Sequence, residues 1–217
     1  MLNRNLGFSV VELLTAMVAG LVVLAGALSL FDSVLMAGNT SLLLSRLSQE
    51  VQGIGDMMSR DIQKAGYHPE AAADVALNRS ASAAHYGFSM TEDLYTEPSA
   101  TGLHCIRIKY WDASLPSDRR SVVRIYSHNR HTQQLKVHTT NKAVDTKSLS
   151  ELCGKGSRLV SSDEIKVAEL LFTLAPGSQT ADVPSLNLTM KAYHVGRPDL
   201  TMSLQRHIYL RNQRGAP

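Results

Sequence analysis

The residues of this sequence that are best suited to metal or redox chemistry are eight histidines and two cysteines. His128 and His131 form the closest histidine pair, but no cysteine or carboxylate follows at the spacing of a zinc site. Asp163 and Glu164 are too few carboxylates for a calcium site. The motifs of nucleophilic hydrolases, zinc proteases and nucleotide-binding loops do not occur. We therefore expect no enzyme activity, no metal and no cofactor.

The two cysteines, Cys105 and Cys153, lie far apart and lack the C-x-x-C spacing of zinc and thiol-redox motifs. A structural disulfide is the simplest use of such a pair, and it requires an oxidising compartment. In the chain-entropy model, a bridge that closes a loop of roughly 50 residues contributes about 4 kcal/mol of stability. The cysteines therefore predict a disulfide in a part of the chain outside the cytoplasm.

Glu12 is the one charged residue in an apolar run from Phe8 to Phe31. As a helix, this run is long enough to cross a hydrocarbon core of ~30 Å. A central carboxylate costs roughly 2.5–3.5 kcal/mol on the translocon scale, and the leucines, valines and phenylalanines of the run outweigh that cost. Because Arg4 precedes the run and the next basic residue is Arg46, we expect a single span with a cytoplasmic N-terminus.

Two ordinary interpretations of the apolar run stay open. A secretory signal would be cut after small residues, and residues 23–25 (VLA) or 25–27 (AGA) fit such a site. A plain uncleaved anchor would keep the whole run. Glu12 argues against a disposable signal, because an acidic residue near its start weakens targeting and has no later use.

The stretch GFSVVELL, residues 7–14, resembles the prepilin cleavage and methylation motif of type IV pilin-like proteins. The resemblance implies cleavage between Gly7 and Phe8 by prepilin peptidase, N-methylation of Phe8, and retention of the helix as membrane anchor and filament core. A carboxylate in an apolar helix needs a cationic partner. We hypothesise that Glu12 pairs with the amino terminus of a neighbouring subunit and so sets the register of assembly.

Beyond Asp32 the apolar residues recur at steps of three and four, which predicts an amphipathic helix that ends near Gly66. Residues 38–40 (GNT) are a weak point where this helix could loosen, and Gly53 and Gly55 each cost about 1 kcal/mol against alanine. Residues 60–67 (RDIQKAGY) resemble the end of the long helix in PilW-type minor pilins and J-type type II secretion pseudopilins. The predicted stripe consists of Leu43, Leu47, Val51, Ile54, Met58, Ile62 and Ala65.

After a long connection over residues 70–102 with one short helix, the apolar residues alternate with a period of two. This pattern predicts an antiparallel sheet of about five to seven strands, packed on the helix stripe. The expected fold is α+β, the type IV pilin fold. Its expected segments are a cleaved leader (1–7), a membrane-spanning and filament-core helix (8–31), an amphipathic continuation (32–66) and a periplasmic β-rich head (67–217).

The net charge of +3 is mild and the basic residues are scattered, so nothing favours a nucleic-acid partner. The resemblance implies a minor pilin that acts in initiation or at the tip of a type IV pilus. Its expected partners are other major and minor pilins, prepilin peptidase and the inner-membrane pilus assembly platform. We expect it in the inner membrane and then in the pilus at the cell surface. The alternatives are a J-type pseudopilin and a membrane-anchored periplasmic binding protein or adhesin.

Overall fold

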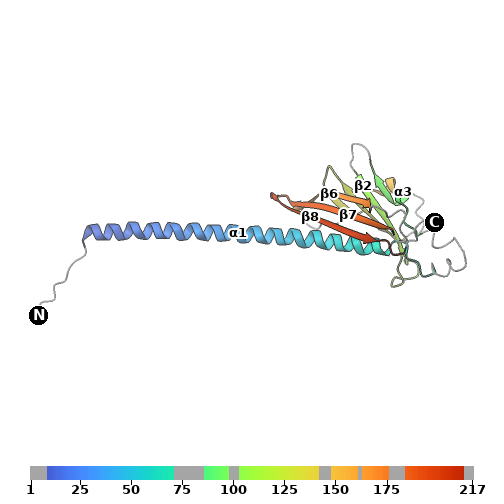
Figure 1. Cartoon of the computed structure of the whole chain (residues 1–217), viewed down its shortest axis with the longest axis horizontal. Coiled ribbons are helices and arrows are strands. Elements are labelled where there is room, and N and C mark those ends of the chain that lie inside the picture. The colour runs from blue at the N-terminus through green and yellow to red at the C-terminus, as the bar shows by residue number, and fades with distance from the viewer. Residues whose placement is uncertain are drawn as a thin grey trace. The chain divides into compact units, whose positions relative to one another are not determined.

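The computed structural model describes residues 9–70, 86–97, 103–141, 148–160, 163–175 and 184–212. The chain divides into two compact units, an N-terminal unit of residues 1–45 and a C-terminal unit of residues 46–217. One helix, α1 (Val10–Lys64), is continuous through both units (Figure 1). Each unit is described by itself below.

Helix α1 does not loosen at residues 38–40, so that part of the sequence prediction is wrong. The hydroxyl of Thr40 donates to the backbone oxygen of Met36 at 2.9 Å, which keeps this polar residue inside the helical bonding pattern. The helix ends where Gly66 adopts a positive φ of 81°, the left-handed conformation typical of the residue after a helix. The end near Gly66 was predicted correctly.

The C-terminal part of the chain also returns to the end of this helix. The side-chain amide of Asn212 donates to the backbone oxygens of Gln63 at 3.1 Å and Ala65 at 3.4 Å. These carbonyls belong to the last turn of a helix, where no intrahelical donor is available. The final described residue thus caps the helix from a distance of 149 positions along the chain.

The described strands form two antiparallel sheets, whereas the sequence predicted one. The first sheet has the order β1-β2-β3-β4-β5 and the second has the order β6-β7-β8. Short helices α3 (Met90–Asp93) and α4 (Leu149–Leu152) precede β1 and β5. The strands are β1 (Leu94–Thr96), β2 (Leu103–Trp111), β3 (Ser121–Asn129), β4 (Gln134–Thr140), β5 (Ser157–Arg158), β6 (Ile165–Leu174), β7 (Ser185–His194) and β8 (Arg197–Tyr209).

The two sheets stay separate because β6 meets the first sheet at a few points only. The amide of Val167 donates to the backbone oxygen of Gln133, in the turn between β3 and β4, at 3.2 Å. The register of β6 against β7 shifts between Val167 and Glu169, and such a bulge bends a strand away from regular pairing. We call this junction of β6 with the β3–β4 end the seam.

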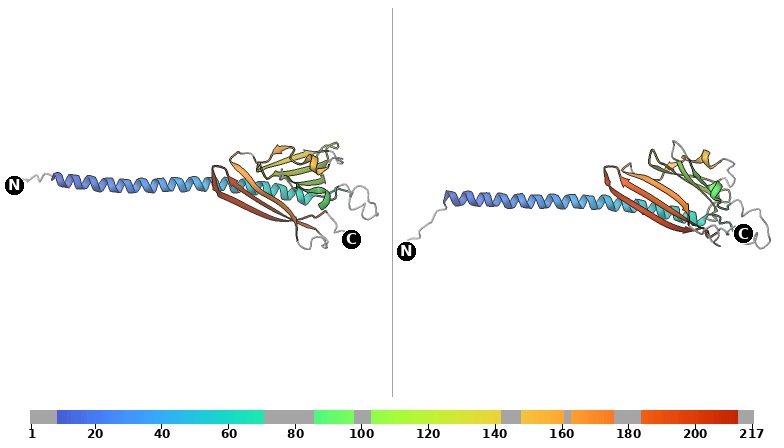
Figure 2. Two further views of the ribbon diagram at one scale, coloured as in Figure 1. Left: turned by 90° about the horizontal axis from the view of Figure 1, so that it is seen from above. Right: turned by 45° about the horizontal axis from the view of Figure 1, so that its top comes forward.

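In the C-terminal unit, α1 lies against the strands of the sheets (Figure 2). Its apolar stripe forms one core with side chains from both sheets. The predicted stripe is confirmed from Leu47 to Ala65, while Leu43 is only partly buried. The inner faces of the sheets supply the rest of this core, including Ile106, Tyr126, Leu188 and Leu204. The α+β fold, with a long helix packed on antiparallel strands, is therefore as predicted.

Alanine substitutions at Gly53 and Gly55 of α1 are expected to have opposite effects on stability. A Cβ atom on the buried Gly55 would lie 2.0 Å from Cδ2 of Leu204 on β8, whereas nothing lies within 4 Å of one on Gly53. We expect Gly53→Ala to raise the free energy of unfolding by about 1 kcal/mol, because alanine is the better helix former. We expect Gly55→Ala to lower it by about 1–3 kcal/mol through overpacking. Urea unfolding of both variants measures this, and equal effects of one sign would contradict the packing of α1 on β8.

Candidate functional site

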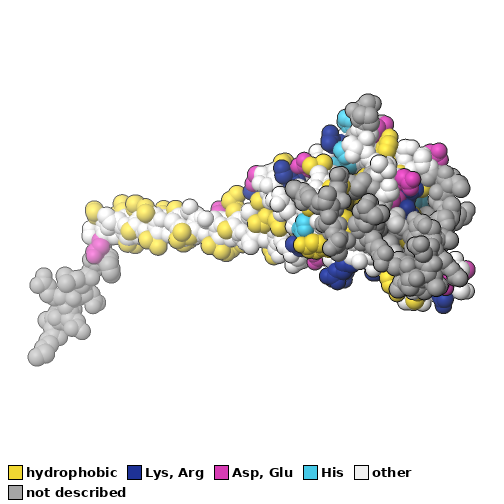
Figure 3. All heavy atoms as spheres, turned by 45° about the vertical axis from the view of Figure 1, so that its right-hand side comes forward, with side chains coloured by type: hydrophobic (Ala, Val, Ile, Leu, Met, Phe, Trp, Pro, Cys, Tyr) yellow, Lys and Arg dark blue, Asp and Glu magenta, His cyan; other side chains and the backbone are white. Residues whose placement is uncertain are grey.

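The N-terminal unit presents an apolar surface without a partner in the monomer. Its part of α1 includes a stretch long and apolar enough to cross a membrane, and none of that stretch is buried. Figure 3 shows apolar side chains around this part of the helix. Exposed apolar surfaces of this size mark sites that contact lipid or other protein chains. Examples of exposed side chains are Val10, Leu14, Val18, Leu21, Leu28 and Leu35.

Glu12 lies in the first turn of α1, where a negative charge is favourable next to the helix N-terminus. Its side chain is exposed, and none of the ion pairs in the described part of the chain involves it. Its backbone oxygen accepts a hydrogen bond from the hydroxyl of Thr15 at 2.9 Å. Gly7 and Phe8, the residues of the predicted cleavage site, lie outside the described residues. Glu12 is thus a carboxylate on an apolar surface, with no ion-pair partner among the described residues.

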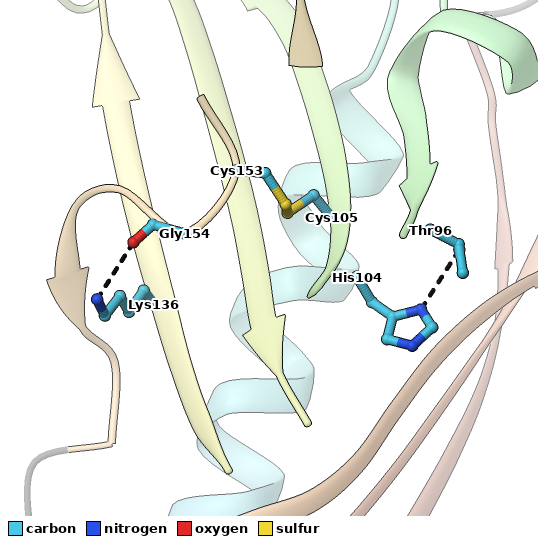
Figure 4. Close-up of a disulfide and its surroundings, with 6 residues drawn as sticks. All are labelled: Thr96, His104, Cys105, Lys136, Cys153 and Gly154. Carbon is cyan, nitrogen blue, oxygen red and sulfur yellow. Dashed lines mark hydrogen bonds between the residues drawn. A yellow bond between two sulfur atoms is a disulfide. The ribbon is translucent and has the colours of Figure 1, made fainter. Parts of the chain in front are cut away.

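In the C-terminal unit, Cys105 on β2 and Cys153 after α4 form a disulfide with a Cα–Cα distance of 5.9 Å (Figure 4). This is the pairing that the sequence predicted. The bridge belongs to a second, smaller core on the outer face of the first sheet, together with Val123, Ile125 and Leu149. The amine of Lys136 adds a hydrogen bond to the backbone oxygen of Gly154 at 3.2 Å. The disulfide therefore fastens α4 over β2 and β3.

The disulfide makes a direct prediction about the mature protein. Alkylation of the denatured chain from native membranes is expected to add no mass without a reductant and two labels after reduction, because both cysteines are bridged. Intact mass spectrometry measures the labels. Two labels on correctly localised protein before reduction would contradict the bridge.

Asp61 has a structural role that the sequence analysis did not identify. It lies on the apolar stripe of α1 and is 3% exposed. Its Oδ2 accepts hydrogen bonds from Nη1 of Arg124 at 2.6 Å and from the hydroxyl of Tyr126 at 2.5 Å. Burial acts to lower the pKa of Arg124, but the hydrogen bond and charge of Asp61 raise it; burial and Asp61 both raise the pKa of Tyr126. This buried cluster joins α1 to β3.

A second buried carboxylate, Asp93, fixes α3 to β2. Its side chain is fully buried, with Nε of Arg107 at 2.6 Å and Nζ of Lys109 at 3.1 Å. The amide of Ser89 also donates to its Oδ2 at 2.8 Å. Arg107 and Lys109 are the polar residues that alternate with the apolar ones on β2. Their role is therefore to hold the short helix and β1 in place.

The structure separates His128 and His131, the histidines that are closest in sequence. His128 is buried on β3, with Nε2 2.7 Å from the backbone oxygen of Val167, while His131 is exposed in the following turn. The residue that lies directly opposite His128 in the strand register is His104 on β2. Within the described residues, no group of three or more histidine, cysteine, aspartate or glutamate side chains is arranged to hold a metal ion.

Taken together, a continuous helix with an apolar N-terminal surface and two antiparallel sheets packed on its other half define a type IV pilin-like protein. This class is structural rather than catalytic. Residues 40–210 match the family model described as prepilin peptidase-dependent protein B (PpdB), and the chain belongs to that family. The family description implies processing by prepilin peptidase. No curated protein and no solved structure gave a significant match.

The family match is independent of the N-terminal motif. It begins inside α1 and ends at Leu210, so the stretch GFSVVELL at residues 7–14 does not contribute to it. Two separate parts of the chain therefore indicate a prepilin-like protein. The apolar helix is consistent with anchoring of a prepilin in the inner membrane.

Proposed function

We propose that this chain is a minor pilin, a structural subunit that acts in initiation or at the tip of a type IV pilus. The observation that carries the proposal is the exposed apolar half of α1, with Glu12 as its acid in the first turn. Before assembly, lipid covers this surface. In a filament, the helices of other major and minor pilins take the place of the lipid.

The proposed processing gives Glu12 its partner. Cleavage after Gly7 creates a new amino terminus at Phe8, close in sequence to Glu12, and methylation keeps the amine basic. In a low-dielectric environment a carboxylate and an ammonium ion attract strongly, and an unpaired carboxylate is costly. The ammonium group of one subunit therefore pairs with Glu12 of its neighbour and fixes the axial position of the incoming subunit at the assembly platform.

A J-type pseudopilin of type II secretion is the second candidate. The observation in its favour is residues 60–67, which resemble both PilW-type minor pilins and J-type pseudopilins. These residues include Asp61 and the glycine at the helix end, and they connect α1 to the sheets in the C-terminal unit. The two candidates differ in the machine that they join and not in the chemistry of the subunit.

Intact-mass analysis of the mature chain from native membranes tests the proposal. We expect a chain that begins at Phe8 and carries a single N-methyl group. A mature start near Gly26 or Leu28 would indicate ordinary secretion and overturn the proposal. Deletion of the gene then separates the two candidates, because a minor pilin is needed for surface pili and a pseudopilin for protein secretion.

A further inference from the structure

Two buried imidazoles face each other beside the seam between the sheets. His104 on β2 and His128 on β3 are register partners in the antiparallel pair, so their side chains leave the same face of the sheet. They are 7% and 1% exposed. Residues opposite each other in this way have Cβ atoms about 4.5–5.5 Å apart. The two rings are therefore close neighbours inside the protein.

Each ring has one nitrogen with a partner and one without. Nδ1 of His104 is 3.3 Å from the hydroxyl of Thr96 on β1 (Figure 4), and Nε2 of His128 is 2.7 Å from the backbone oxygen of Val167 on β6. Within the described residues, Nε2 of His104 and Nδ1 of His128 have no hydrogen-bond partner. Because a carbonyl only accepts, His128 is the Nε2–H tautomer. A second proton would therefore enter a buried site that has no acceptor.

Burial and the nearby positive charge oppose that second proton. Burial, followed by the charge of Arg130, lowers the pKa of His104. Burial lowers the pKa of His128 against the opposing effect of its hydrogen bond to Val167, and His104 and Arg130 lower it further. The charge of Glu169 on β6 acts in the opposite direction and raises the pKa of His128, but this carboxylate also pairs with Lys191 at 3.4 Å. Two protonated imidazoles beside Arg130 would thus gather positive charge between the sheets.

The same place in the fold joins the two sheets. Val167 uses both backbone groups there, since its oxygen accepts from His128 and its amide donates to Gln133. The hydroxyl of Tyr193 on β7 donates to Oε1 of Gln133 at 2.5 Å. A small set of hydrogen bonds from β6 and β7 therefore reaches the β3–β4 end. A change at His128 acts directly on this set.

We propose that His104 and His128 form an acid-sensitive latch: the neutral pair keeps the seam closed, and protonation of the pair opens it and frees the edge of β6. The open seam exposes both rings to water, so they take up protons there with an ordinary affinity. Opening therefore becomes more favourable as the pH falls below about 6.5. This latch does not depend on Glu12 or on cleavage after Gly7.

Hydrogen exchange of the full-length chain in detergent micelles tests the latch. After correction for the intrinsic rate, exchange of the Val167 amide is expected to accelerate by up to about tenfold per histidine for each pH unit below 6.5. The control is the Gly66 amide, which donates to the backbone oxygen of Lys109 over a distance of 3.0 Å. This hydrogen bond does not involve the histidine pair or β6. Equal acceleration of both amides would mean global acid unfolding and would overturn the proposal.

Matched histidine variants complete the test. In His128→Gln, the amide nitrogen of the side chain still donates to Val167 but gains no charge, and His104→Gln removes the second titrating ring. We expect the double variant to lose the acid acceleration at Val167. His131→Gln is the control, because this exposed histidine lies in the adjacent turn and is expected to leave the acceleration unchanged. Full acceleration in the double variant would overturn the assignment of the latch to this pair.

Discussion

Glu12→Ala is expected to reduce incorporation of this chain into filaments by at least about a hundredfold, because it leaves the neighbour's buried ammonium ion without a partner. Breaking a buried ion pair by removing one partner costs about 3–5 kcal/mol, and about 1.4 kcal/mol corresponds to a factor of ten. Membrane insertion is expected to persist, since removing a carboxylate from the apolar run makes insertion easier. Immunoblots of sheared filaments and of membranes measure both quantities.

Two further variants show whether charge is the cause. Glu12→Gln keeps the size and polarity of the side chain and removes its charge, so we expect it to fail in the same way as alanine. Asp32→Ala removes the next acidic residue along α1 and is expected to assemble normally. If Glu12→Ala co-assembles at the wild-type level in membranes that contain it, the pairing hypothesis is wrong.

Asp61→Ala is expected to lower the free energy of unfolding by about 3–5 kcal/mol, because Arg124 then keeps its charge in a partly buried site without a partner. The matched control is Asp56→Ala on the same helix. Asp56 also pairs with an arginine, Arg206 at 3.2 Å, but both side chains are about half exposed. Removing that pair should therefore cost only about 0.2–1 kcal/mol.

Urea unfolding followed by fluorescence of Trp111, the single tryptophan, measures both variants. A second variant separates the loss of the ion pair from a general packing defect. The double variant Asp61→Leu/Arg124→Leu leaves no unpaired charge. We therefore expect this double variant to be less destabilised than Asp61→Ala alone. Similar losses for Asp61→Ala and Asp56→Ala would contradict the role of the buried cluster.

Local periodicity made much of the fold predictable. The spacing of Leu47, Val51, Ile54, Met58 and Ile62 defines one face of a helix whatever that face packs against, and the structure buries all of them. The alternation of Ile106, Ile108 and Tyr110 in the same way defines the inner face of β2. Both patterns depend on residues a few positions apart. A sequence displays such patterns directly.

Periodicity gives the face of a strand but not its neighbours. The alternation of apolar residues contains neither the bulge after Val167 nor the hydrogen bond from Val167 to Gln133, which joins the two sheets. The same limit applies to His128. His131 is the nearest histidine in the sequence, whereas the strand register places His104 opposite His128.

For a buried carboxylate, the sequence can indicate a charge in the core but not the residues that pair with it. Asp61 interrupts the apolar stripe, and an acid at such a position indicates a paired charge in the core. Its partners Arg124 and Tyr126 lie 63 and 65 positions away, so their identity depends on the tertiary fold. The candidate assembly site at Glu12 differs in this respect, because the residues of its motif are consecutive in the sequence.

The cap that Asn212 places on α1 constrains when the C-terminal unit can finish folding. The helix is synthesised first, but the hydrogen-bond donor of its last turn is the side chain of Asn212, the final described residue. Arg206, which pairs with Asp56 of the helix, is also synthesised near the end. Contacts so distant in sequence form slowly, because a long loop must close before they give any stability. The C-terminal unit of an exported chain would thus stay incompletely packed until its last strand had crossed the membrane.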